Sequence, residues 1–408
     1  MHRQQLCRSG LFIGFLVVTS ELAAAVLPGF RVEKIAPSAG FVTSVAFDSQ
    51  NRLYYSVRTG GIFRLDGTES VQVAAVETAS VGNEALLGIA FRGPREIVAH
   101  YVAPDHTADV ISAIDLETGT VTEIHRFVCA DGQVCSSEHH GGNLIVTPDG
   151  SIFFGIGDLG NGPVAQDLRS PGGKIWRIGR NGETSMFALG FRNPFDMLFD
   201  STIDRLILAD NGPTAEDEVN HVVEGGNYGW PSTMGNQPGA AGLTGPSYVF
   251  TGVVAPTGMT QLREVGMLRA RSVLVSTFVT GALYYFPTVS VDSIARPEIV
   301  IKGEVGPIID VAQNETGEIY FSSSKNIYRL HPPRPGDANG DGQVDAADFE
   351  ALSSEILDED DGATLRAQDG AFRGSWGADV NRDGTIDAGD LVALAKLQHQ
   401  RGRAARRK

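Results

Sequence analysis

The sequence of 408 residues has little cysteine, an excess of acidic over basic residues and no long hydrophobic run beyond its N-terminal region. Three cysteines are too few for a small scaffold held together by disulfides. The net charge of −16 argues against a nucleic-acid surface, which needs clustered lysine and arginine. We therefore expect an ordinary globular protein with no nucleic-acid partner and no transmembrane segment in the mature chain.

The N-terminal residues follow the order of a secretory signal. Basic residues come first, then the apolar run Leu11–Val18, then the small residues Ala23–Ala25. This order predicts a signal peptide over residues 1–25 and a secreted or periplasmic protein. The alternative is an N-terminal anchor that is not cleaved. The mature chain would keep Cys129 and Cys135, whose spacing in an exported protein favours a local disulfide over a metal site.

A repeated unit of strand, polar turn and strand favours an all-β fold. The second strands of four such units begin near Leu53, Ile152, Leu206 and Ile319. The gaps of 99, 54 and 113 residues correspond to two, one and two repeats of about 50 residues, the length of a four-stranded blade. We expect a six-bladed β-propeller over residues 29–330. A β-sandwich or an array of smaller β domains is the alternative.

Three segments place polar and glycine residues where strands end. The first, SSEHHGGNLIVTPDGSIFFGIGD, runs from Ser136 to Asp158 and contains His139. The second is GFRNPFDMLFD, with Arg192 and Asn193. The third is ADNGPTAEDEVNHVVEGGNYGWP, residues 209–231. In a propeller, loops that are distant in sequence gather at one end of the axis, so these segments can share one pocket.

In content and order these segments resemble the soluble glucose/sorbosone dehydrogenase family, also called aldose sugar dehydrogenases. ALLGIAF from Ala85 and GKIWRI from Gly173 also fit, and the resemblance covers residues 30–330. It implies a six-bladed propeller that carries pyrroloquinoline quinone (PQQ) and calcium and oxidises aldose sugars to lactones.

The resemblance also implies roles for individual residues. His139 would be the general base, Asp158 would orient its ring, and Arg192 and Asn193 would contact the quinone. Asn83 would lie at the cofactor site in place of the family's usual glutamine. The carbonyls of Gly212 and Pro213 would bind the calcium that bridges to PQQ, and a second calcium region would contain Asp217, Glu218 and the Tyr228 carbonyl.

Each of these residues also has a purely structural interpretation. His139 can be an ordinary loop histidine beside His140. Arg192 can stabilise the edge of a blade through an ion pair with a carboxylate. Asp217 and Glu218 can be solvated, and an aromatic residue such as Tyr228 is more often part of a core.

The chain departs from the family pattern where basic residues are expected to neutralise the carboxylates of PQQ. Val279 or Thr280 stands where a lysine is expected, and Pro307 and Ile309 stand where an R-x-R pair is expected. Burying three unpaired carboxylates would cost several kcal/mol. Either other basic residues take over, or PQQ binds weakly or not at all; the candidates to take over are Lys174, Arg177 and Arg263. The competing functions are a non-catalytic propeller that binds carbohydrate or protein, and calcium-dependent hydrolysis.

A second, small domain follows a proline-rich linker at residues 331–336. Two twelve-residue loops, Asp337–Asp348 and Asp379–Asp390, have the oxygen side chains and the glycine at position 6 of an EF-hand loop. An apolar helical stripe follows each loop, so the two units must pack together, and calcium binding would be coupled to folding. The expected calcium ligands are Asp337, Asn339, Asp341, Gln343, Asp345 and Asp348 in one loop, and Asp379, Asn381, Asp383, Thr385, Asp387 and Asp390 in the other.

This pair of loops resembles the dockerin type I domain, over residues 337–400. The resemblance implies a cohesin-like partner from a polysaccharide-processing assembly. The partner-reading positions 10 and 11 are Ala346–Ala347 and Ala388–Gly389 instead of the usual hydroxyl pair, which argues against the familiar cohesin specificity. The basic tail, residues 401–408, is expected to be disordered, with a weak anchor to anionic surfaces as the alternative.

Overall fold

The computed structural model describes residues 25–405, except 28, 130–134, 237–240, 291–292, 358–375 and 384. The expected signal peptide therefore lies outside the described residues, apart from Ala25. No helix in the described part of the chain is long and apolar enough to cross a membrane.

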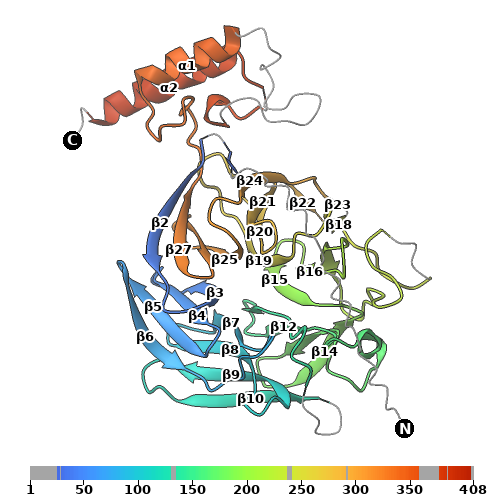
Figure 1. The fold of residues 1–408 in the computed structure, drawn as a ribbon. Helices are drawn as coiled ribbons and strands as arrows, with labels where there is room; N and C mark the ends of the chain where they lie inside the picture. The colour runs from blue at the N-terminus through green and yellow to red at the C-terminus, as the bar shows by residue number, and fades with distance from the viewer. Residues whose placement is uncertain are drawn as a thin grey trace, which may run out of the picture.

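Six four-stranded antiparallel units stand around a common axis and form a six-bladed propeller (Figure 1). The first three blades run from the inner to the outer strand in chain order. Blade 1 consists of β3 (Val42–Phe47), β4 (Leu53–Val57), β5 (Gly61–Asp66) and β6 (Glu69–Ala75). Blade 2 consists of β7 (Leu86–Phe91), β8 (Glu96–Val102), β9 (Ala108–Asp115) and β10 (Val121–Val128). Blade 3 consists of β11 (Leu144–Val146), β12 (Ile152–Ile156), β13 (Lys174–Ile178) and β14 (Thr184–Leu189).

The last three blades complete the ring. Blade 4 consists of β15 (Pro194–Asp200), β16 (Arg205–Asp210), β17 (Glu218–Val222) and β18 (Tyr248–Val249). Blade 5 consists of β19 (Pro256–Gln261), β20 (Val273–Thr277), β21 (Ala282–Phe286) and β24 (Glu298–Lys302), with β1 (Ala25–Val26) at its edge. Blade 6 consists of β25 (Ile308–Gln313), β26 (Ile319–Ser323), β27 (Asn326–His331) and the N-terminal β2 (Arg31–Pro37). The short strands β22 (Val289–Ser290) and β23 (Ser293–Ile294) pair with each other.

Pairing of β2 with β27 closes the ring, because it makes an N-terminal strand the outer strand of the last blade. Closure of this kind stabilises the sheets against opening. The predicted repeat is confirmed: Leu53, Ile152 and Ile319 begin the second strands of blades 1, 3 and 6, and Leu206 lies in the second strand of blade 4.

The hydrophobic core lies between neighbouring blades. In one cluster, Tyr54 and Ile62 of blade 1 pack against Leu86 and Ile97 of blade 2. Each such side chain contributes about 1.5–3 kcal/mol when it leaves water. Because every blade contributes to the clusters on both of its sides, the inner strand ends are held rigidly around the axis.

The C-terminal domain contains α1 (Ala346–Leu357) and α2 (Ala388–Ala405), which pack together through Leu352 and Leu394 (Figure 1). The short 3-10 helix η3 (Trp376–Ala378) contacts the propeller, where Trp376 packs edge-on against Phe30 and Tyr285.

The prediction that the basic tail is disordered is wrong for residues 401–405, because α2 continues to Ala405. The sequence there consists of alanine, arginine and a single glycine. Alanine and arginine are good helix formers.

Candidate active site

The histidine loop, residues 136–142, lies between the disulfide and β11. His139 has a left-handed backbone with φ of 55°, a conformation that costs energy in residues other than glycine and is found at functional sites. A side chain on Gly141 would place its Cβ 2.2 Å from the Gly155 carbonyl oxygen, so the loop lies directly on blade 3. The glycine pair therefore serves close packing of the loop that carries His139.

Asp158 holds the His139 ring through a short hydrogen bond. His139 Nδ1 donates to Asp158 Oδ1 at 2.6 Å, and the Trp230 indole nitrogen donates to Asp158 Oδ2 at 2.8 Å. Asp158 is almost fully buried, while 15% of the His139 side chain is exposed. Because Nδ1 carries the hydrogen, Nε2 is the basic nitrogen, and no described residue hydrogen-bonds to it. This arrangement can accept a proton.

Arg192 lies beside the same tryptophan. Its guanidinium donates to the carbonyls of Asn211 and Gly212, at 2.9 Å each, and stands 5.9 Å from the Trp230 ring centre. Trp230 therefore links Arg192 to the His139–Asp158 pair, and the structure brings these three predicted residues together.

Asn193 and its backbone are fixed by two neighbours. The side-chain oxygen of Asn193 accepts a hydrogen bond from the Gly141 backbone amide at 3.1 Å. The Asn193 backbone amide donates to the buried Asp210 carboxylate at 2.7 Å. Burial, and then the nearby charge of Glu218, raise the pKa of Asp210 to about 8. Asn193 thus connects the histidine loop to blade 4.

A cavity of about 340 Å³ lies on the propeller axis next to the histidine loop. Asn83 and Asn193 line it, whereas His139, Asp158 and Arg192 are not among its lining residues, although Gly141 of the histidine loop and Asn193, next to Arg192, are. Each of the six blades contributes one residue near the start of its first strand; five of them are the second residue of that strand, and Gly142 lies two residues before β11. These six residues, here called the neutral ring, are Thr43, Leu87, Gly142, Phe195, Thr257 and Ile309.

The neutral ring arises from a repeated irregularity of the inner strands. In five of the six blades the inner strand shifts register across the ring residue, as between Leu86 and Gly88 or between Ile308 and Asp310. A β-bulge of this kind re-aims a side chain, here towards the axis. The Thr257 hydroxyl is already bonded to the Ile308 carbonyl at 2.8 Å. None of the six residues of the neutral ring is ionisable, so the ring carries no charge.

None of the three basic residues expected to take over lines this cavity. Lys174 is buried and donates to the carbonyls of Val164, Asp167 and Gly172. Its pKa is lowered to about 8, chiefly by burial.

The two arginines lie elsewhere, each beside an acidic residue. Arg177 is 3.6 Å from Asp149, and Arg263 is 4.0 Å from Glu315. Among the residues that line the cavity, the one basic side chain is Arg58, which the sequence did not indicate, and it donates to the Ser80 and Gly82 carbonyls.

The residues predicted for propeller calcium are engaged with the protein. Gly212 donates its amide to Asp217 at 2.9 Å, and the other Asp217 oxygen accepts the amides of Val254 and Ala255. Glu218 accepts from Asn220 and from the Gly235 amide. Asp217 and Glu218 are adjacent on blade 4. Their carboxylate oxygens accept hydrogen bonds from the neighbouring loops.

The Tyr228 side chain is buried in the protein, and the carbonyls of Tyr228 and Pro213 stay predicted ligands. Tyr228 stacks on Phe191 and donates to the His221 carbonyl at 2.5 Å. Within the described parts of the chain, no group of three or more histidine, cysteine or acidic side chains is placed to hold a metal. Propeller calcium stays a prediction.

The two dockerin-like loops have the same internal geometry. The last aspartate of each loop, Asp348 or Asp390, accepts the amides of positions 3 and 9. Asp337 and Asp379, the first residues, are also buried. The residues at positions 3, 5 and 9 are exposed at the loop surface: Asn339, Asp341 and Asp345 in the first loop, and Asn381, Asp383 and Asp387 in the second. Gln343 and Thr385 occupy position 7 of their loops.

Comparison with known proteins identifies both regions. The family model described as glucose/sorbosone dehydrogenase matches residues 42–330, and the dockerin type I model matches residues 335–397. The chain belongs to the glucose/sorbosone dehydrogenase family. The predicted resemblance is therefore confirmed for both regions.

Two curated relatives in this family have low identity. The chain is similar to quinoprotein glucose dehydrogenase B of Acinetobacter calcoaceticus, 25% identical over 281 residues, or 57% of this chain and 58% of that protein. It is 26% identical over 231 residues to an aldose sugar dehydrogenase of Escherichia coli, or 48% of this chain and 62% of that protein. The chain thus spans about three fifths of the length of these relatives.

Solved structures support the fold. A PQQ-bound aldose sugar dehydrogenase from Streptomyces coelicolor is 23% identical, with a TM-score of 0.65, and the match covers 75% of this chain and 99% of that one. The apo form of the Escherichia coli aldose sugar dehydrogenase is 20% identical, with a TM-score of 0.66 over 74% and 99% of the two chains. At these identities the likeness establishes the propeller fold alone.

Proposed function

We propose that the propeller is a sugar dehydrogenase in which His139 takes the proton of an aldose's anomeric hydroxyl. The observation that carries the proposal is the geometry of the His139 imidazole. Asp158 and Trp230 fix its Nδ1 side, and its Nε2 has no hydrogen-bond partner among the described residues. The loop that carries it forms part of the wall of the cavity through Gly141 and Gly142.

The chain supplies the proton-accepting half of the oxidation. Conversion of an aldose to a lactone removes the hydroxyl proton and a hydride from the same carbon, and added PQQ would accept the hydride and be reoxidised by the dye. Imidazole exchanges protons near neutral pH, and the Asp158 carboxylate stabilises the imidazolium that forms. The aldose would enter the cavity, where the side-chain amides of Asn83 and Asn193 can hydrogen-bond to its hydroxyl groups.

PQQ, the cofactor bound in the Streptomyces relative, does not fit the whole cavity. Its three carboxylates would meet the neutral ring, where Ile309 and Thr257 offer no charge. Arg58 and Arg192 are the nearby cations, and both already donate to backbone carbonyls. Unpaired buried carboxylates cost several kcal/mol. We therefore propose that the chain keeps the proton-accepting residues and has lost tight binding of PQQ.

Reconstitution tests this function. Purified protein is incubated with PQQ and Ca²⁺ over a wide range of PQQ concentrations, and aldose-dependent reduction of a dye is measured. We expect reduction that saturates only at high PQQ and disappears in His139→Asn. If the wild-type protein binds PQQ and still reduces no dye with any aldose, the dehydrogenase proposal is wrong.

A second candidate is carbohydrate binding without oxidation, and the neutral ring favours it. The cavity combines amides with the partly exposed aromatic rings Phe41 and Phe278, each 41% exposed. Amide hydrogen bonds and aromatic faces suit an uncharged sugar. Calorimetric titration with neutral sugars, in the absence of PQQ, detects such binding. Binding without dye reduction would support this candidate over the first.

We also propose export of the mature chain and calcium binding by the dockerin-like loops. The disulfide between Cys129 and Cys135, with sulfurs 1.95 Å apart, is typical of exported proteins. In the first loop, burial and then the charges of Asp348 and Asp341 raise the pKa of Asp337. A calcium ion would offset that repulsion, and carboxylate, amide and carbonyl oxygens are the ligands it prefers. A cohesin-like partner would then meet the exposed Ala346–Ala347 and Ala388–Gly389.

A further inference from the structure

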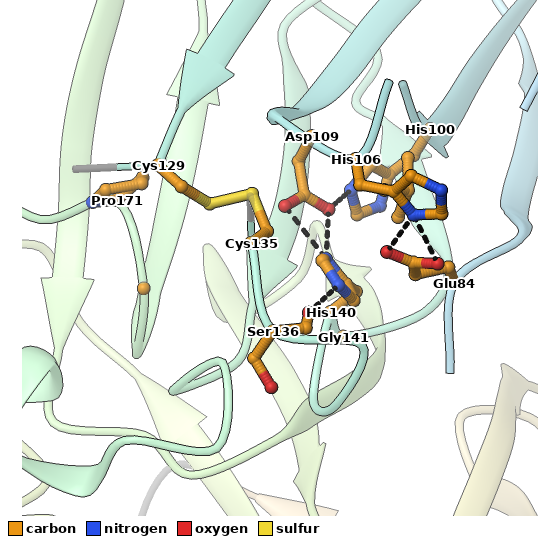
Figure 2. Close-up of polar contacts among 12 residues, drawn as sticks. Glu84, His100, His106, Asp109, Cys129, Cys135, Ser136, His140, Gly141 and Pro171 are labelled. Atoms are coloured by element: carbon orange, nitrogen blue, oxygen red, sulfur yellow. Dashed lines mark hydrogen bonds and ion pairs between the residues drawn. A yellow bond between two sulfur atoms is a disulfide. The ribbon is translucent and has the colours of Figure 1, made fainter. Parts of the chain in front are cut away.

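A buried carboxylate lies between two imidazoles next to the histidine loop (Figure 2). Asp109, on β9 of blade 2, has Oδ1 3.2 Å from His100 Nε2 and Oδ2 3.0 Å from His140 Nδ1. All three side chains are fully buried. His140 directly follows the proposed base, so this cluster adjoins the active site without being part of its proton path.

The outer nitrogens of both imidazoles face backbone carbonyls. His140 Nε2 is 2.7 Å from the Ser136 carbonyl oxygen, and His100 Nδ1 is 3.1 Å from the Gly142 carbonyl oxygen. Carbonyl and carboxylate oxygens only accept hydrogen bonds, so each ring satisfies both contacts only as an imidazolium that donates from both nitrogens. The shorter contacts at His140 make it the stronger candidate for the charged form.

The pKa shifts of His140 and Asp109 agree with a charged His140. Burial alone would lower the pKa of His140, but the charge and hydrogen bond of Asp109 outweigh burial and raise it. Burial would raise the pKa of Asp109, but the two histidines outweigh it and lower it to about 2. The other titratable groups facing the cluster are Glu84 and His106, which are 2.8 Å from each other.

The two carbonyls held by the cluster belong to the two ends of the histidine loop. Ser136 begins the loop and Gly142 ends it, so Asp109 ties both ends to blade 2. The disulfide between Cys129 and Cys135 lies next to the same loop (Figure 2), and the Cys135 amide donates to the His106 carbonyl at 2.6 Å. The Asn83 amide donates to the Ser137 carbonyl at 2.7 Å.

We propose that Asp109 is a positioning residue for His139. The buried His100–Asp109–His140 cluster fixes both ends of the histidine loop, and this support keeps His139 in its left-handed conformation with Nδ1 on Asp158 and Nε2 free. The inference deepens the proposed function and rests on the role of His139 as the base.

The direct test is ¹⁵N spectroscopy of the histidine side chains in the full-length protein, with signals assigned by single His→Gln variants. At neutral pH we expect His140 to show two protonated nitrogens and His139 to show one tautomer, with the hydrogen on Nδ1. In Asp109→Asn we expect His140 to be neutral and His139 to populate both tautomers. A neutral His140 in the wild-type protein, or an unchanged His139 in folded Asp109→Asn, would overturn the proposal.

The matched control is Asp200→Asn. Asp200 is also fully buried; it accepts from Thr202 in its own blade and from Gln261 in blade 5, away from the histidine loop. It should leave the His139 signals unchanged. In the dye assay, Asp109→Asn should lower kcat by up to about 100-fold, as misplacement of a catalytic group does, and Asp200→Asn should not. Because the spectra need no turnover, they test the positioning role even if the dehydrogenase proposal fails.

Discussion

The two sides of the axial cavity differ in how much polar chemistry they contain. On the histidine side, His139, Asp158 and Trp230 form a continuous chain of hydrogen bonds. On the side of blades 5 and 6, the ring residues Thr257 and Ile309 are uncharged, and the Thr257 hydroxyl donates to the Ile308 carbonyl. The first side carries a hydrogen-bonded imidazole and carboxylate, and the second has an uncharged surface.

The difference teaches that the residues proposed for proton transfer can be changed separately from the ring positions that are proposed to weaken PQQ binding. His139 and Asp158 belong to blade 3, and Trp230 follows blade 4, whereas Thr257 and Ile309 belong to blades 5 and 6. Each ring residue is one position on one inner strand. A substitution there changes the charge of the cavity and leaves the hydrogen bonds of Asp158 in place.

Removing the proposed base should have the largest effect on activity and act on the histidine side of the cavity alone. His139→Asn should lower aldose-dependent dye reduction by about 10²- to 10⁴-fold, because the general base is lost, while sugar binding persists. The measurement is steady-state kinetics on the reconstituted protein, with calorimetry for sugar binding. His125→Asn, on β10 and away from Asp158, is the control. Full activity of His139→Asn would end the assignment of the base.

Adding a positive charge to the neutral ring should raise the affinity for PQQ and leave the histidine side unchanged. Ile309→Arg puts a guanidinium where the cavity now has an apolar side chain, and one charge-assisted hydrogen bond contributes about 1.5–3 kcal/mol. PQQ affinity should therefore rise about tenfold to a hundredfold, as measured by calorimetric titration. Ile309→Leu is the control that keeps the ring neutral. Equal PQQ affinity of the folded arginine and leucine variants would contradict the explanation based on charge.

Weakening the histidine side by one hydrogen bond should have a smaller effect. Trp230→Phe leaves Asp158 Oδ2 without its indole donor, a loss of about 1–3 kcal/mol for a buried group. We expect kcat to fall about tenfold. Trp176→Phe removes an indole hydrogen bond of similar length, to the Pro171 carbonyl at 3.0 Å, in a part of blade 3 away from Asp158. Similar losses in both variants would mean that Trp230 only stabilises the fold.

Calcium removal should leave both sides of the cavity folded and act on the C-terminal domain. Chelation should unfold α1 and α2, because buried Asp337 and Asp348 would repel each other without the ion. Circular dichroism would show loss of helical signal with the sheet signal retained. Asp348→Ala should imitate chelation, and exposed Glu350→Ala should not. Helices that are indifferent to chelator and to Asp348→Ala would argue against calcium coupling.

Much of the fold could be predicted from the sequence because the blade repeats itself. Strand runs near Leu53, Ile152, Leu206 and Ile319 recur at multiples of one blade length, and the structure places each in the second strand of its blade. The apolar stripes after the two acidic loops likewise form α1 and α2.

The candidate site could be predicted only where a local motif carries it. His139 and Asp158 stand at the ends of one recognisable segment. Trp230 carries no local signal of its role, because its bond to Asp158 joins residues 72 positions apart. Asp109 and His140, on different blades, show no local pattern. The neutral ring takes one residue from each blade, so only closure of the propeller brings its members together.

The most direct test of the central claim is a calorimetric titration of the wild-type protein with PQQ in the presence of Ca²⁺. The account predicts weak binding, with a dissociation constant of about micromolar or higher, because the neutral ring leaves the carboxylates of PQQ unpaired. It also predicts that no PQQ is retained through purification. Tight, about nanomolar binding with PQQ retained would contradict the claim that the anion-binding side of the cavity has been lost.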